Sequence, residues 1–138
     1  MLTWLNYDLP FEPLLSYWLG GISVYDREDD LGEQLWAYDP NKKGDREQII
    51  KKFLLKRFDH LTYRHKFLLF RLLETALFSE RYDFSKEFES SYDEHRSLAW
   101  DETQIEDPRG FFEDIYQLAS DEWKEDLAKA VLEDPSDW

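Results

Sequence analysis

The sequence predicts an all-α fold: a single-domain bundle of six or seven helices around a central buried helix at about residues 62–79. Apolar residues recur at helical spacing through most of the chain. Capping and turn residues separate these segments by short links. The length of 138 residues fits one domain with a substantial core, so we assign residues 1–138 to it.

The N-terminal part is predicted to form two short helices. The first covers residues 11–19, carries a proline in its first turn and would end at Gly20-Gly21. Residues 22–25 are apolar enough to be extended, but four residues predict a strand only weakly. An acidic run opens the second helix, over residues 26–38, because carboxylates stabilise a helix N-terminus.

A helical hairpin is predicted next. Asp45 is a suitable N-cap, with Gln48 at the capping-box position, for a helix that runs to about Asp59. Thr62 is the cap of the following helix, and the link between the two helices is only three residues long. So short a link favours an antiparallel arrangement of the two helices.

Residues 62–79 form the predicted central helix because apolar side chains lie on nearly every side of it. Arg64, Arg71 and Thr75 fall on one line beside Glu74 and leave only a narrow polar stripe. A helix this apolar is normally buried in the centre of a domain. Its length and charges exclude a membrane span.

After the central helix, a further helix capped by Asp83 or Ser85 is expected to run to about Leu98. Apolar residues recur every four positions in this stretch and mark one buried face. Residues 100–106 lack any such period, so we interpret them as a loop.

The C-terminal part is predicted to contain two helices. Asp107 and Pro108 combine a capping side chain with a proline in the first helical position. The last helix is expected to begin at Ser120 and to end at Pro135, which cannot continue it.

Charge is distributed unevenly along the chain, whose formal net charge is −14. Residues 42–71 hold ten basic and three acidic residues, whereas the segments on either side are strongly acidic. Such differences in sign persist as surface patches after folding. The basic segment can pair internally with the acidic helices, although that pairing leaves most of the acid unneutralised.

A strongly acidic protein repels phosphate groups, so neither nucleic acid nor an anionic membrane is an expected partner. Its natural partner is a basic protein surface; alternatively, the charge serves solubility alone. The absence of cysteine excludes disulfides, thiolate catalysis and cysteine metal sites. The apolar N-terminus lacks a basic start and is interrupted by Asp8 and Pro10, so we expect no signal peptide and a cytoplasmic protein.

No catalytic or metal-binding pattern is evident. His60, His65 and His95 do not share the spacing of a zinc-binding helix, and no H-E-x-x-H is present. Residues 26–30 resemble the start of a calcium loop, but the glycine falls one position late. Gly-rich phosphate loops and nucleophile elbows are also absent from the sequence. We therefore expect no enzyme, no cofactor and no metal.

The candidate partner-binding surface surrounds Trp100. An aromatic ring supplies buried contact area, and carboxylates around it steer a basic partner into place. Alternatively, Trp100 closes the core beneath the loop, and the sequence leaves both interpretations open. The predicted partner-binding residues are Asp93, Glu94, Trp100, Asp101, Glu102, Glu106 and Asp107.

In size, absence of cysteine, helicity, acidity and aromatic content, the chain resembles the small acidic immunity proteins of bacterial toxin–immunity pairs. The resemblance covers the general character of the chain and no motif, so it assigns no functional residues. It implies tight binding to a basic toxin domain, often a nuclease, which is neutralised by occlusion. Another protein-binding module, such as a secretion chaperone, an anti-defence inhibitor or a DNA mimic, is the alternative, and a small enzyme is less favoured.

Overall fold

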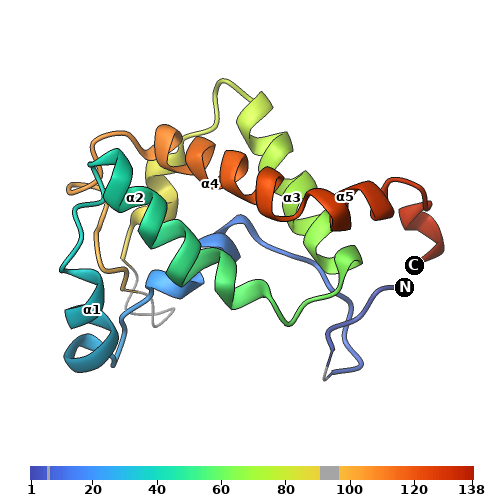
Figure 1. Cartoon of the computed structure of the whole chain (residues 1–138), viewed down its shortest axis with the longest axis horizontal. Coiled ribbons are helices and arrows are strands. Elements are labelled where there is room, and N and C mark those ends of the chain that lie inside the picture. The colour runs from blue at the N-terminus through green and yellow to red at the C-terminus, as the bar shows by residue number, and fades with distance from the viewer. Residues whose placement is uncertain (6, 91–96) are drawn as a thin grey trace.

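The computed structural model describes residues 1–5, 7–90 and 97–138. Helices joined by short loops make up the fold (Figure 1), and the predicted all-α class is confirmed. None of the helices in the described ranges combines the length and apolarity that a membrane span requires. In chain order, with η for 3-10 and π-helical turns, the elements are η1 (Leu15–Ile22), η2 (Glu28–Gly32), α1 (Glu33–Leu35), α2 (Lys43–Ile49), η3 (Ile50–Leu55), η4 (Lys56–Phe58), α3 (Tyr63–Phe78), η5 (Phe84–Phe88), α4 (Pro108–Glu122), α5 (Lys124–Ala130) and η6 (Pro135–Asp137).

Both helices of the predicted hairpin and their short link are present, but the first arm packs mainly on η1 and α4 rather than on α3, and its first cap differs from the prediction. α2, η3 and η4 follow one another without a break and form the first arm, which begins at Lys43 rather than after Asp45. The Asp45 carboxylate instead accepts a hydrogen bond from the backbone N–H of Asp39 at 2.9 Å, so it fastens the preceding loop. Thr62 caps α3 as predicted, because its hydroxyl oxygen accepts a bond from the backbone N–H of His65.

α3 packs against η1, α4 and α5. Its buried residues are His65, Leu69, Phe70 and Leu73, which lie along the face that these neighbours cover. The last turn is open to solvent, where Phe78 is 77% exposed. Burial of α3 is therefore complete along one face and ends before its C-terminus.

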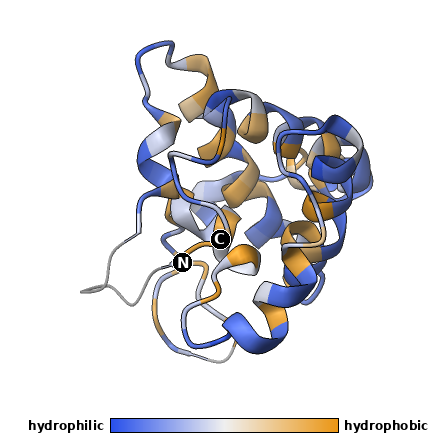
Figure 2. Cartoon of the chain, turned by 90° about the vertical axis from the view of Figure 1, so that its left-hand side faces the viewer, coloured by the Kyte–Doolittle hydropathy of each residue, from blue (hydrophilic) through white to orange (hydrophobic). Residues whose placement is uncertain are grey.

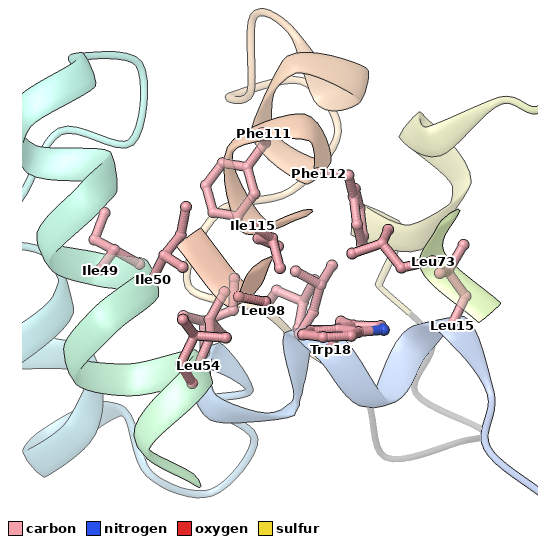
Figure 3. Close-up of a cluster of buried hydrophobic side chains, with 14 of the residues drawn as sticks. Leu15, Trp18, Ile49, Ile50, Leu54, Leu73, Leu98, Phe111, Phe112 and Ile115 are labelled. Carbon is pink, nitrogen blue, oxygen red and sulfur yellow. The ribbon is translucent and has the colours of Figure 1, made fainter. Parts of the chain in front are cut away.

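The core lies between η1, η3, α3 and α4 and includes Trp18 of η1 (Figure 3). Trp18 is fully buried, and its ring stacks on that of Trp123 with centroids 5.4 Å apart. The indole N–H of Trp18 donates to the carbonyl of Leu69 at 3.2 Å, which satisfies the one polar atom of that ring. Both tryptophans therefore belong to the core.

The first helix is displaced from its predicted position, since η1 spans Leu15–Ile22 and contains Gly20 and Gly21. These glycines do not end the helix; they let it approach η3. A Cβ on Gly21 would lie 1.8 Å from the carbonyl oxygen of Phe53, a contact that no side chain allows. The glycine pair is thus a packing feature rather than a stop signal.

η5 ends at Phe88, so the helix predicted to run to Leu98 is wrong at residues 89–90 and 97–98, while residues 91–96 lie outside the described residues. Residues 97–99 are instead paired with residues 22–24, through hydrogen bonds from Val24 N–H to the Ser97 carbonyl and from Ala99 N–H to the Ile22 carbonyl. Leu98 is buried by this antiparallel pairing. The weakly predicted extended segment at 22–25 thus finds its partner far along the chain.

At the C-terminus, Asp107 caps α4 with Pro108 in its first turn, as predicted. The side chain of Asp107 accepts from the N–H of Gly110 at 3.0 Å. The boundary between the last two helices lies at Trp123 and not at Ser120, where the prediction is wrong. The helix breaks where the Trp123 ring is directed into the core beside Trp18.

Candidate protein-binding surface

The loop predicted at residues 100–106 is held in shape by its own side chains. The Asp101 carboxylate accepts hydrogen bonds from the backbone N–H of Thr103 at 2.9 Å and from the Thr103 hydroxyl. The amide oxygen of Gln104 accepts from the N–H of Asp101 at 3.0 Å. Ile105 is only 3% exposed and anchors the loop to the core. The exposed tip of the loop therefore rests on a fixed turn.

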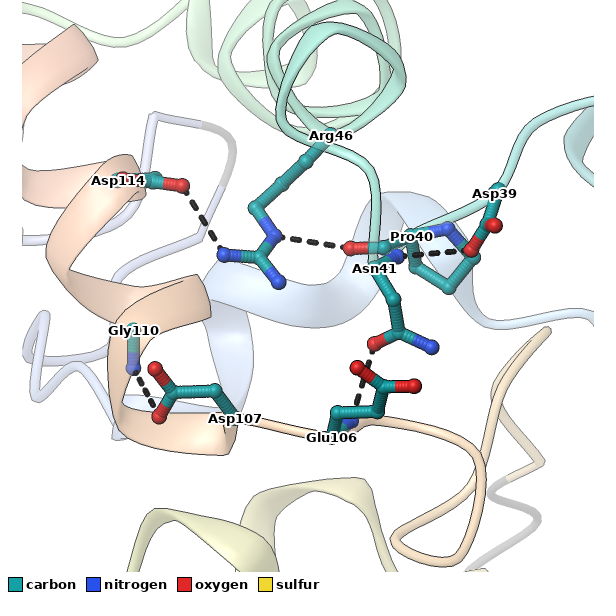
Figure 4. Close-up of polar contacts among 8 residues, drawn as sticks. All are labelled: Asp39, Pro40, Asn41, Arg46, Glu106, Asp107, Gly110 and Asp114. Atoms are coloured by element: carbon teal, nitrogen blue, oxygen red, sulfur yellow. Dashed lines mark hydrogen bonds and ion pairs between the residues drawn. The ribbon is translucent and has the colours of Figure 1, made fainter.

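Asn41 holds the same loop from outside (Figure 4). Its side-chain N–H donates to the carbonyl of Gln104 at 2.8 Å, and its side-chain oxygen accepts from the N–H of Glu106 at 3.0 Å. One amide therefore bonds to the backbone at two points of the loop. Asn41 is itself positioned by Asp39, whose carboxylate accepts from the Asn41 backbone N–H at 3.0 Å.

Arg46 fastens this arrangement to α4 (Figure 4). Its Nε donates to the carbonyl of Pro40 at 2.8 Å, and its Nη1 forms an ion pair with Asp114 at 3.1 Å. The guanidinium also lies over the ring of Phe111, 5.5 Å from the centroid. The loop that carries Asn41 is therefore held against the same helix that begins at the end of the acidic loop.

The predicted acidic residues have different roles in this arrangement. Glu102 and Glu106 are exposed, and no partner for either carboxylate is present among the described residues. Asp101 shapes the turn and Asp107 caps α4. Hydrogen bonds from Thr103, first from its hydroxyl and then from its N–H, lower the pKa of Asp101 below the usual aspartate value, so it is ionised at neutral pH.

Trp100 is buried, with 6% of its surface exposed. It belongs to the hydrophobic core, which is the second of the two interpretations that the sequence leaves open. The ring is therefore not an exposed anchor beside the acids. Asp93 and Glu94, the other two predicted partner-binding residues, lie outside the described residues.

The exposed aromatic ring beside this loop is that of Trp36, which is 50% exposed. Its indole N–H donates to the carbonyl of Ala99 at 2.9 Å, directly before Trp100 in the chain. The ring also lies close over Gly32, where an added Cβ would come within 3.0 Å of the ring atoms. Trp36 is thus an exposed indole whose orientation is fixed from two sides.

Exposed acidic residues lie near Trp36 in the chain and also near its partner Ala99 in the chain. η2 and α1 carry exposed acids on the helical side, and the loop after Ala99 carries others. α1 and this loop lie on the same side of the molecule in Figure 1, and Figure 2 shows that this side is largely hydrophilic. We call this the Trp36 surface and define it by Asp29, Glu33, Trp36, Asp101, Glu102 and Glu106.

Comparisons with protein-family models, with curated proteins and with solved structures found no match.

Sequence reasoning missed Trp36 and Asn41. A signal for Trp36 exists, because the ring lies off the stripe of Leu31, Leu35 and Tyr38 that the helix pattern directs inward. No comparable signal exists for Asn41, because its partners lie 63 and 65 residues further along the chain. The two hydrogen bonds from Asn41 to the acidic loop become apparent only when both loops are located in the folded structure.

Two of the three histidines, His60 and His65, lie within the described residues. His65 is 2% exposed, and its Nε2 lies 2.7 Å from the carbonyl of Thr3 while its Nδ1 lies 2.6 Å from the Thr62 hydroxyl. A neutral ring with its proton on Nε2 donates to Thr3 and accepts from Thr62, so both nitrogens are engaged. His60 is exposed, and His95 lies outside the described residues. Within the described ranges no three His, Asp or Glu side chains are arranged to hold a metal ion.

Proposed function

We propose that this chain is an acidic protein-binding inhibitor that attaches to a basic partner through the Trp36 surface and occludes it. The observation that carries the proposal is the exposed but fixed indole of Trp36, with exposed acidic residues in its own helical segment and in the loop that follows its partner Ala99. Among proteins of this kind, the immunity proteins of bacterial toxin–immunity pairs match its size, acidity and helical fold. A toxin domain with a basic, nuclease-like surface in the bacterial cytoplasm is the partner that we propose.

Interfaces depend on a few aromatic anchors in rigid surroundings, whereas charged residues at the rim mainly set the association rate. Trp36 is held by Ala99 and Gly32, so little conformational freedom of the ring is lost on binding. The loop with Glu102 and Glu106 is held by Asn41 before any partner arrives. In a nuclease-like partner, such carboxylates would occupy the place of substrate phosphates.

The test begins with the product of a neighbouring reading frame, or with the protein recovered by affinity purification, as the partner. Trp36→Ala is expected to raise the dissociation rate by about thirtyfold, which corresponds to the ~2 kcal/mol of an anchor residue. Surface-based binding kinetics measures this change. Trp36→Phe keeps a ring but loses the bond to Ala99, so it should lie between Trp36→Ala and the wild type.

The carboxylates are tested by a matched pair of triple variants. Glu33→Gln, Glu102→Gln and Glu106→Gln together should lower the association rate severalfold at low salt and much less at about 0.5 M, where screening is short-ranged. The control removes three exposed acids of α4 and α5 instead, through Glu113→Gln, Glu122→Gln and Glu125→Gln. Equal effects of the two triples, or normal binding by Trp36→Ala, would show that the Trp36 surface is not the interface.

A further inference from the structure

Two adjoining hollows of the described surface share Gly20 of η1 and Arg57 of η4. The first, which we call the aromatic pocket, has a volume of about 460 Å3 and is lined by Trp4, Tyr17, Phe58, Ser16, Ser23 and other residues. The second, which we call the cationic pocket, has a volume of about 390 Å3 and is lined by Arg27, Lys52, Lys56, Arg57 and apolar neighbours. Volumes of this size are typical of small-molecule sites.

The charge of the two hollows is opposite to that of the chain. The formal net charge is −14, yet no Asp or Glu is found among the described residues that line either hollow. Lys52, Lys56 and Arg57 form no ion pair with any part of the chain that the structure describes. Arg27 lies 3.8 Å from Asp30, but both side chains are more than half exposed, so this pair is weak.

Arg57 lies at the boundary between the hollows, directly against the backbone of η1. A Cβ on Gly20 would lie 1.5 Å from Nη1 of Arg57, so the guanidinium occupies the space that a side chain would fill. The fork-shaped donor set of an arginine binds phosphate oxygens in pairs. Because Gly20 has no side chain, the guanidinium of Arg57 can lie between the two hollows.

The aromatic pocket suits a planar ring. Trp4 lies with its ring 5.8 Å from that of Tyr17, and Phe58 contributes a further aromatic wall. Flat apolar walls of this kind stack planar heterocycles. The hydroxyls of Ser16 and Ser23 and the imidazole of His60 add hydrogen-bonding groups to the same lining.

We propose that these hollows form a binding site for a nucleoside polyphosphate, with the base in the aromatic pocket and the phosphates in the cationic pocket. Four cationic side chains match the three to four negative charges of a triphosphate, and Arg57 contacts the part of the ligand that joins the two hollows. The net charge of the protein does not oppose this, because screening limits distant charges to a range of about 8 Å at physiological salt. The site is independent of the Trp36 surface.

Calorimetric titration with ATP in the absence of magnesium tests the site. ATP is expected to bind about tenfold or more tightly than either adenosine or tripolyphosphate, because each of these occupies only one hollow. Arg57→Gln should weaken ATP binding about tenfold and Lys56→Gln about threefold. Lys43→Gln, the matched control, removes the same charge from an exposed position outside both hollows and should change binding less than about twofold.

Gly20→Ala provides a second variant that keeps every charge. The new methyl group displaces only the mobile end of Arg57, so the protein should fold normally while ATP binding weakens severalfold. The proposal is overturned if ATP gives no binding at about 1 mM. It is equally overturned if tripolyphosphate binds as tightly as ATP, or if Lys43→Gln weakens binding as much as Arg57→Gln does.

Discussion

The basic segment, residues 42–71, has two faces that meet different surroundings. One face lies against the acidic C-terminal helices and is neutralised there. The other, with Lys52, Lys56 and Arg57, lines the cationic pocket beside η1 and stays unpaired within the described residues. The ion pairs of the first face are Arg46–Asp114 at 3.1 Å, Arg64–Glu133 at 2.9 Å and Lys66–Asp126 at 3.2 Å.

This difference separates basic residues that stabilise the fold from basic residues that are available to bind an anion. The side chains of Arg46 and Lys66 are only 12% exposed, so their pairs are partly shielded from water and contribute to stability. Exposed, unpaired cations contribute little to stability but can bind an anion without breaking an existing pair. Six of the ten basic residues of this segment therefore divide into two groups of three, one paired with the C-terminal helices and one lining the cationic pocket.

The largest expected effect is that of Arg46→Met, which removes a partly buried ion pair and the bond to the Pro40 carbonyl. It leaves Asp114 without its partner, and we expect a loss of about 2 to 3 kcal/mol, somewhat below the ~3–5 kcal/mol of a fully buried pair. Urea denaturation followed by circular dichroism measures it. Arg46→Lys should lose an intermediate amount of stability. If Arg46→Met lowers the free energy of unfolding by less than about 0.5 kcal/mol, the paired face contributes no more to stability than the unpaired face does.

A smaller effect is expected from Glu133, which receives hydrogen bonds from Tyr63, Arg64 and Trp138. These bonds, first that of Tyr63, lower the pKa of Glu133 below the usual glutamate value. The unfolded chain then binds a proton more readily than the folded one, so this contribution is present near neutral pH and is lost as the pH falls through the folded pKa.

Denaturation curves across a pH series test this linkage. Between about pH 5 and pH 3, the wild type should lose stability more steeply than Glu133→Gln, whose side chain does not titrate. Glu125→Gln, an exposed position on α5, serves as the control and should follow the wild type. Parallel curves for Glu133→Gln and the wild type would contradict the proposed contribution.

The smallest effect on stability is expected at the unpaired face. Arg57→Gln and Lys56→Gln should each change the free energy of unfolding by less than about 0.5 kcal/mol, because neither side chain loses a partner. Thermal and urea denaturation of these variants measures the contribution of the unpaired face to stability. Arg57→Gln is expected to weaken ATP binding without changing stability. A loss above about 1 kcal/mol would assign Arg57 to the structural group instead.

Two tryptophans illustrate how far a local pattern predicts a surface. Trp100 stands among carboxylates in the sequence, yet it is buried because residues 97–99 pair with residues 22–24 and draw the ring inward. Trp36 has no acidic residue directly beside it in the sequence, and only its position off the inward stripe of its helix marks it, yet it is the exposed ring beside the acidic loop. Proximity to acidic residues in the sequence therefore does not show which ring is exposed.

The sequence by itself determined the helical class, the caps at Thr62 and Asp107, and the division into basic and acidic segments. These depend on residues three or four positions apart, whose interactions are the same in any fold. Only the tertiary structure decided which cations are paired, which tryptophan is exposed and how Asn41 holds the acidic loop. Those outcomes depend on contacts between residues some 60 positions apart, which helical periodicity does not encode.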